Sequence, residues 1–437
     1  MQFLYLILSL YFGRKNPLFY LIFPIAMVSG PGAFIDPRTV LFGADIFTIG
    51  KNMYKDVIIL YLFLVALYLK YRYKVPIIIK SPVLLYSVYL LLLIVLTLST
   101  TGTNYDAINL MRLFLYMVLG FFLMLTIFST ANSRQFIVFF NLLLWATGIL
   151  SIFYVLNSSK IMPLFYQENL YQEVDFGQDS FFRDFSTIPY FSLFIFILAF
   201  TVTLLKSKIF NPKAVLLVLC TYPIVLLYTF TRSLLAATII ECVLIIAFIA
   251  YRNPGRIFNK STIALGLAGL ILFGIVQSKF TNELGYYTER VNSAKTEGVN
   301  EGNALIRIAY HVKAYDIVSR NNVLLTGAGL NKQNEAEMDT VGAWTADSTI
   351  PFLLLYTGLI GIIIYYYLGF HFLFKTWSQI KHSFNPISLT LFVTILSSTL
   401  SSFIMGGYRW GDPFIFFPFV LVVALGRLFK SENLSVN

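Results

Sequence analysis

Four arginines, a histidine and an aspartate are the residues of this sequence whose types could together handle a phosphorylated substrate. They are Arg112, Arg232, Arg290, Arg307, His311 and Asp347. A guanidinium can hold a phosphate through two parallel hydrogen bonds. An imidazole or a carboxylate can take up a proton from a neighbouring hydroxyl. The set therefore predicts an anion-binding site with a proton acceptor beside it.

Arg232 stands at the start of an apolar run, in the segment TFTRSLLAATII. A helix that begins here would place the guanidinium beside free backbone N–H groups. Charge and helix dipole would then together favour an anion such as phosphate. The alternative is an arginine that snorkels to a membrane surface, and this segment alone does not separate the two interpretations.

Arg307 and His311 lie four residues apart in the segment NALIRIAYHVKAYDIVSR, which is predicted to form an amphipathic helix. Their spacing places both on one helical face, where the guanidinium could clamp a phosphate while the imidazole moves a proton. The alternative is a surface helix with a solvated charged face. Arg290, in YYTERVNS upstream, is a further candidate for the anion. The apolar or aromatic positions of the predicted helix include Ala304, Ile308, Tyr315 and Ile317.

Asp347 directly precedes another apolar run, in VGAWTADSTIPFLLLYTGLIG. Asp or Ser at such a position is a common helix cap, which accounts for Asp347 and Ser348 without any function. The functional interpretation holds Asp347 at the membrane surface, opposite Arg232, where it could accept a proton from a sugar hydroxyl.

Arg112 and Glu241 are charged residues inside apolar runs. Charges at such depth are costly, and they face a polar cavity or each other. We therefore expect either a buried polar site, with Arg112 as a deep phosphate contact, or a structural ion pair between Arg112 and Glu241.

The runs that position these residues are typical of a membrane protein. The chain has 437 residues, of which 58% are hydrophobic and 12% charged, and its mean hydropathy is +0.75. Long apolar stretches recur at about the 20 residues that a membrane-spanning helix needs. The first 12 residues are too short to span and are expected to form an interfacial helix, with an additional span as the alternative. The predicted spans are 17–35, 57–69, 82–99, 108–128, 136–156, 187–205, 214–230, 233–251, 262–278, 348–370, 386–405 and 412–427.

The polar breaks between the runs fall into two classes. One class is short and holds more than half of the lysines and arginines, with Glu432 as its only carboxylate. This asymmetry is the positive-inside pattern, so these breaks, and both termini, are predicted to be cytoplasmic. The three longer segments, 36–56, 157–186 and 279–345, then face outward. The net charge of +11 therefore reflects topology, and a nucleic-acid partner is not expected.

The resulting fold class is an all-α polytopic membrane protein of about 12 transmembrane helices. We expect an N-terminal bundle over 1–278, an extracytoplasmic helical loop over 279–347, and C-terminal spans over 348–437. Cys220 and Cys242 fall inside predicted spans, so neither a disulfide framework nor a zinc site is expected. There is no GxxxxGK[ST] pattern, which argues against an ATP-driven pump. The outer segment MPLFYQENLYQEVDFGQDSFFRDF either stacks on sugars or is an interfacial helix and loop.

Four short motifs in a fixed order suggest a family. They are TFTRSLLA at the start of one span, RIAY and GAGL in the large outer loop, and GLIG in the span that follows. This order, over about 230–362, resembles the O-antigen polymerase and O-antigen ligase superfamily of bacterial envelope glycosyltransferases. The resemblance implies that Arg232, Arg290 and Arg307 engage the diphosphate of an undecaprenyl-linked sugar donor. Arg112 would be a deeper contact, and no metal or cofactor is implied.

The resemblance also indicates which branch of the superfamily to expect. Ligases of this kind use a histidine close to the following span, whereas this sequence has AWTADST there. Asp347 occupies roughly that place, which favours a polymerase with Asp347 or His311 as the base. The substrate would be a lipid-linked repeat of O-antigen, capsule or exopolysaccharide on the outer face of the bacterial inner membrane. A chain-length regulator and a flippase would be its partners. A ligase, a flippase or other transporter, and a length-control protein without catalysis remain the alternatives.

Overall fold

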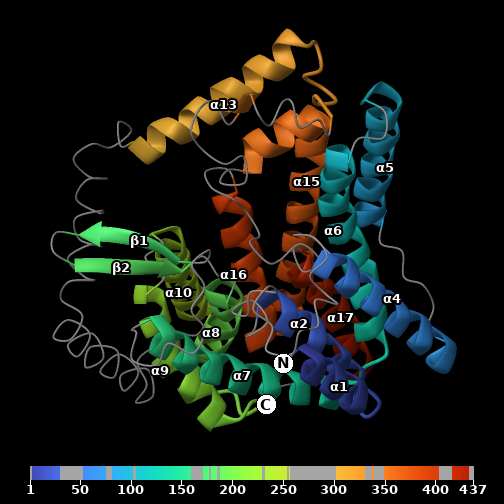
Figure 1. The fold of residues 1–437 in the computed structure, drawn as a ribbon. Coiled ribbons are helices and arrows are strands. Elements are labelled where there is room, and N and C mark those ends of the chain that lie inside the picture. The colour runs from blue at the N-terminus through green and yellow to red at the C-terminus, as the bar shows by residue number, and fades with distance from the viewer. Residues whose placement is uncertain are drawn as a thin grey trace.

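The structure is a computed structural model that is predominantly helical (Figure 1). It describes residues 2–29, 53–74, 81–101, 105–158, 171–176, 179–184, 188–228, 232–252, 255, 302–329, 337–338, 349–402 and 416–432.

The helices lie where the apolar runs of the sequence predict them. Before residue 160 they are α1 (Gln2–Gly13), the 3₁₀ helix η1 (Pro17–Leu21), α2 (Ile22–Ser29), α4 (Met53–Tyr73), α5 (Ser81–Thr101), α6 (Tyr105–Ser129) and α7 (Ser133–Ser158). After it they are α8 (Ile188–Leu204), α9 (Pro212–Tyr228), α10 (Arg232–Arg252), α13 (Gly302–Arg320), α15 (Thr349–His382), α16 (Pro386–Ser401) and α17 (Phe417–Glu432). The predicted span 262–278 lies outside the described residues.

Three of the helices in the described ranges are long and apolar enough to cross a bilayer. They are Ser133–Leu156, Leu234–Arg252 and Thr349–His382, and several shorter apolar helices accompany them. Their length and composition support a membrane protein. The full set of twelve spans remains a prediction.

Several predicted segments differ from the structure in extent, such as 57–69, which is helical over Met53–Tyr73. The first span, 17–35, begins as the 3₁₀ helix η1, because Asn16 accepts a hydrogen bond from the Leu18 N–H and Pro17 opens the turn. The span predicted to end at 370 continues as helix to His382. Lys381 and His382 occupy its last turn, where cations favour the negative end of the helix dipole, so an apolar run alone underestimates its length.

A β-hairpin occupies part of the segment 157–186, which is predicted to face outward. Strand β1 (Tyr171–Phe176) pairs antiparallel with β2 (Asp179–Asp184), and Tyr171 lies opposite Asp184. The interpretation of MPLFYQENLYQEVDFGQDSFFRDF as an interfacial helix and loop is therefore wrong for residues 171–176 and 179–184, and the rest of that segment lies outside the described residues. Both strands carry two aromatic residues, and β1 adds the β-branched Val174, which suits a strand.

Aromatic side chains fill the bundle core where α6, α15 and α17 meet. The rings of Phe372 and Phe419 stack at 4.5 Å, and Phe121 lies 6.2 Å from Phe372. All three side chains are at most 1% exposed. Such ring contacts fix the position of α15, the helix against which α13 packs.

Candidate functional site

Helix α13 crosses the end of the bundle above α15, at the opposite end from α1 (Figure 1). Its buried face is formed by four side chains at helical spacing. Of the apolar or aromatic positions that the sequence shows, Ile317 is buried, whereas Ile308 and Tyr315 are 45% and 56% exposed. These two residues lie away from the stripe that the helix presents to the bundle. The buried residues are Tyr310, Ala314, Ile317 and Val318.

Arg307 and His311 share a face of α13, as their spacing predicts, and both are half-buried. His311 Nδ1 lies 2.8 Å from the Arg307 backbone oxygen. Because a carbonyl can only accept, Nδ1 carries the hydrogen. A neutral imidazole then has its lone pair on Nε2, and that atom can accept a proton. The pair therefore offers an anion-binding guanidinium and a proton acceptor one helical turn apart.

An ion cluster that the sequence did not predict joins the C-terminal part of α13 to Glu337. Arg320 Nη2 donates to both carboxylate oxygens of Glu337, at 2.8 and 2.9 Å, and Lys313 Nζ lies 3.1 Å from the same carboxylate. The hydrogen bond from Arg320, followed by that from Lys313, holds the pKa of Glu337 below its ordinary value. The only sign of this cluster in the sequence is that basic residues of α13 are followed by acidic residues in the next segment.

The segment after α13 docks into a break in α15. Gly358 has φ 63° and ψ −168°, so the helix is interrupted there. The Leu359 and Ile360 N–H groups donate to the carbonyls of Leu324 and Leu325 at 3.0 and 3.1 Å. In return, the Ala328 N–H donates to the Leu355 carbonyl at 2.7 Å. The backbone groups that the break frees are thus paired with residues 324–328, which satisfies their hydrogen bonds.

Helix α5 supports the same junction. The Tyr89 hydroxyl donates to the Thr357 carbonyl, directly before the break. A Cβ built on Gly329 would lie 3.1 Å from Thr97 Oγ1, so α5 also approaches the loop closely. The GAGL and GLIG motifs therefore form one structural junction, and its place beneath α13 sets the position of Arg307 and His311.

Arg112 pairs with Asp56 and not with Glu241. Its Nη1 lies 3.6 Å from Asp56 Oδ2, and the Tyr116 hydroxyl donates to the other carboxylate oxygen. Asp56 lies in the first turn of α4, and α4 packs against α6. The alternative of an ion pair between Arg112 and Glu241 is wrong, because Arg112 lies beside Asp56 and Glu241 hydrogen-bonds to a hydroxyl of α16. A phosphate would have to compete with Asp56 for Arg112.

Glu241 has its own polar surroundings between α10 and α16. Its side chain is 2% exposed, and Thr394 Oγ1 donates to Glu241 Oε2 at 3.4 Å. The Ser397 hydroxyl also hydrogen-bonds to this carboxyl group. Buried polar groups are normally satisfied in this way, and α16 supplies hydroxyls one turn apart for the purpose. The described contacts of Glu241 are with α16, so Glu241 does not belong to the Arg307 and His311 site.

The structure describes only part of the remaining candidates, Arg232, Arg290 and Asp347. Arg232 is the first residue of α10, so the helix begins where the sequence predicts, but its side chain lies outside the described part of the chain. Arg290 and Asp347 both lie outside the described residues. The structure thus brings Arg307 and His311 together and places Arg112 in a separate contact with α4.

No metal-binding group of three or more His, Cys, Asp or Glu residues occurs within the described ranges. The sequence matches no known protein family, and a comparison with curated proteins also finds no match.

Proposed function

We propose that the chain is a polymerase of undecaprenyl-diphosphate-linked oligosaccharide repeats. The observation that carries the proposal is the Arg307 and His311 pair on α13, which is held over the end of the bundle by the paired break in α15. The order of the motifs TFTRSLLA, RIAY, GAGL and GLIG supports the same function. The enzyme would act on O-antigen, capsule or exopolysaccharide repeats.

In the proposed reaction, the oxygen of an acceptor sugar hydroxyl attacks C1 of the donor glycan. The bond from C1 to the diphosphate oxygen breaks, and undecaprenyl diphosphate leaves with the electron pair. The acceptor proton goes to His311 Nε2 or to the Asp347 carboxylate. Arg232, Arg290 and Arg307, with Arg112 as a deeper contact, stabilise the charge that develops on the diphosphate. Holding two lipid-anchored substrates together supplies much of the remaining rate enhancement.

The proposal includes a topology of about 12 spans in the bacterial inner membrane, with both termini cytoplasmic. The large loop and α13 then face outward, where lipid-linked repeats are displayed. A chain-length regulator and a flippase in the same membrane would be its partners. A ligase would use the same donor chemistry with lipid A core as acceptor, but the AWTADST segment lacks the histidine that such enzymes place there.

One observation favours a second candidate, a transporter or flippase of lipid-linked oligosaccharides. Glu241 is buried inside α10 and faces hydroxyls of α16, and carboxylates at that depth often lie on proton or substrate pathways. A second polar contact between buried side chains joins α16 to α8, where Thr390 Oγ1 lies 3.2 Å from Thr201 Oγ1. This arrangement is also compatible with a purely structural polar contact between helices.

The experiment is the glycan length profile of a strain that lacks the gene. The strain is complemented with wild type, Arg232→Ala, Arg307→Ala, or the control Arg134→Ala on the opposite side, with membrane expression confirmed for each. We expect single repeat units in the deletion strain, and a ladder that wild type and Arg134→Ala restore but the other two variants do not. If the deletion strain instead accumulates full-length polymer on the lipid carrier, the protein is a ligase and not a polymerase. Repeats that accumulate on the cytoplasmic face would establish a flippase.

A further inference from the structure

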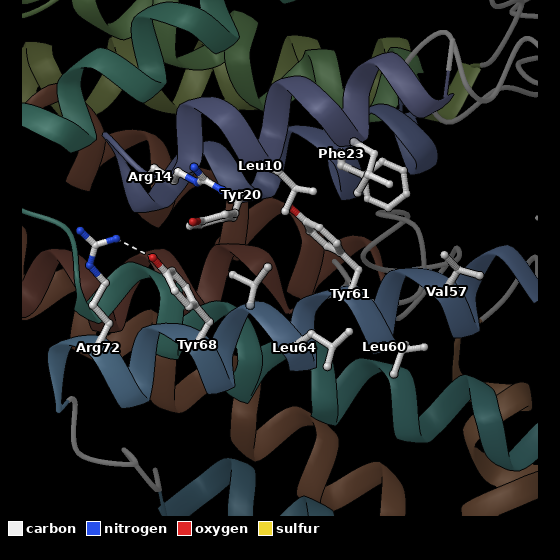
Figure 2. Close-up of a pocket in the computed structure, with 12 residues that line it drawn as sticks. Leu10, Arg14, Tyr20, Phe23, Val57, Leu60, Tyr61, Leu64, Tyr68 and Arg72 are labelled. Carbon is white, nitrogen blue, oxygen red and sulfur yellow. Dashed lines mark hydrogen bonds between the residues drawn. The ribbon is translucent and has the colours of Figure 1, made fainter.

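An apolar groove runs between the N-terminal helices and α4, away from α13. Its volume is about 690 Å³, within the roughly 300–1,000 Å³ of pockets that hold small molecules. Figure 2 shows α1 and η1 on one side and α4 on the other. Exposed leucines line much of its length: Leu10, Leu60 and Leu64 are 43%, 58% and 57% exposed.

Buried aromatic residues form the floor of the groove and hold its two walls together. Ser9 Oγ donates its single hydrogen to the Phe19 carbonyl at 2.8 Å, so the Tyr61 hydroxyl, 2.7 Å away, donates to Ser9. The rings of Phe23 and Tyr61 pack edge to face at 5.0 Å. Because these contacts join α1 and α2 to α4, the groove is a built feature of the fold.

The two ends of the groove differ in polarity. Arg14 and Arg72 lie at the same end, beside Tyr20 and Tyr68, and the opposite end reaches Val57 (Figure 2). The Arg72 guanidinium donates to the Tyr68 hydroxyl and lies 5.8 Å from the centre of that ring. This bond holds Arg72 over the groove mouth. The groove therefore has a cationic, hydrogen-bonding head and an apolar body.

We propose that this groove binds one anionic phospholipid, with its phosphate between Arg14 and Arg72 and an acyl chain along Leu10, Leu60 and Leu64. The division into a cationic end and an apolar body matches a phospholipid, whose charge and hydrocarbon are separated in the same way. Guanidinium groups hold phosphate oxygens through paired hydrogen bonds. Basic pockets between helices on the cytoplasmic side are typical sites for acidic head groups, and both arginines belong to the breaks that are predicted to be cytoplasmic.

A second protein chain fits this groove less well. An apolar helix from another copy would bury two guanidinium groups without an acidic partner, which is costly. A lipid phosphate meets that charge while its chain covers the exposed leucines. The site also lies apart from the proposed catalytic residues, so it concerns anchoring of the N-terminal helices and not glycan transfer.

The test measures lipid retention. The full-length protein is purified in mild detergent, mixed with phosphatidylglycerol, phosphatidylcholine or inorganic phosphate, and examined by native mass spectrometry. We expect one phosphatidylglycerol to be retained at least several-fold more than phosphatidylcholine. The double variant Arg14→Gln/Arg72→Gln should remove this preference, and Arg134→Gln, a control at another cytoplasmic break, should keep it.

A second variant tests the apolar body of the groove without changing its charge. Leu64→Trp should fill part of the groove and lower phosphatidylglycerol retention, with the arginines intact. Unchanged retention in either Leu64→Trp or the double arginine variant would overturn the proposal. Equal retention of both lipids would also overturn it, and so would inorganic phosphate that displaces the lipid at equal concentration, because the acyl chain would then contribute nothing.

Discussion

Gly327 and Gly358 meet backbone against backbone, so that neither position has room for a side chain. A Cβ on Gly327 would lie 2.6 Å from the Gly358 nitrogen, and a Cβ on Gly358 would lie 2.4 Å from the Gly327 nitrogen. Both residues also have positive φ, at 78° and 63°. Because this contact allows the segment after α13 to pair with the broken helix, it connects α13 to the helical bundle.

Replacing Gly358 by alanine should destabilise the protein severely. The substitution combines a strained backbone conformation, at about 1–3 kcal/mol, with a clash against backbone that cannot move aside. We expect a clear loss of thermal stability in detergent. Gly369→Ala on the same helix is the matched control, because its Cβ would meet the Thr399 side chain at 3.1 Å and no backbone. Equal melting temperatures for the two variants would contradict this role for Gly358.

Arg307→Lys should keep the charge but lose the paired hydrogen bonds to a phosphate. Since charge-assisted hydrogen bonds contribute about 1.5–3 kcal/mol, we expect shorter glycan ladders with lysine and stronger loss with alanine. Asp316→Asn, at an exposed position of the same helix, should leave the ladder unchanged. A wild-type ladder from Arg307→Ala would remove Arg307 from the proposed site.

The Glu337 cluster should make stability depend on pH. Its pKa is lowered in the folded protein, so its contribution is fully present above the ordinary pKa of glutamate, about 4.3, and is lost as pH falls through the folded pKa. Glu337→Gln should therefore lower the melting temperature near neutral pH, and the difference from wild type should vanish in acid. Added salt should reduce the difference too, since the ions are solvent-accessible. A difference that is independent of pH would show that the ion cluster is not its source.

Variants of Glu241 distinguish the proposed polymerase from the alternative transporter. Glu241→Gln keeps a hydrogen-bonding group opposite Thr394, whereas Glu241→Ala leaves buried hydroxyls unpaired, which costs about 1–3 kcal/mol. We expect near-normal stability and a normal glycan ladder with glutamine, and lower stability with alanine. If the glutamine variant folds but traps repeats on the cytoplasmic face, Glu241 carries transport and the polymerase proposal fails.

The local features of this protein could be predicted from the sequence. Apolar runs of suitable length predict helices such as α7 and α10, and Arg232 does begin α10. The spacing of Arg307 and His311 places them on one face of a helix whatever surrounds it. These features depend on residues close together in the chain, so the pattern of side chains is sufficient to determine them.

The partners of the charged groups were decided by tertiary packing. Arg112 and Asp56 lie on different helices, and only the approach of α4 to α6 selects Asp56 instead of Glu241. The fit of Gly327 against Gly358 likewise depends on how the segment after α13 returns to the broken helix α15. No local pattern encodes these distances, because each is set by the packing of segments far apart in the sequence.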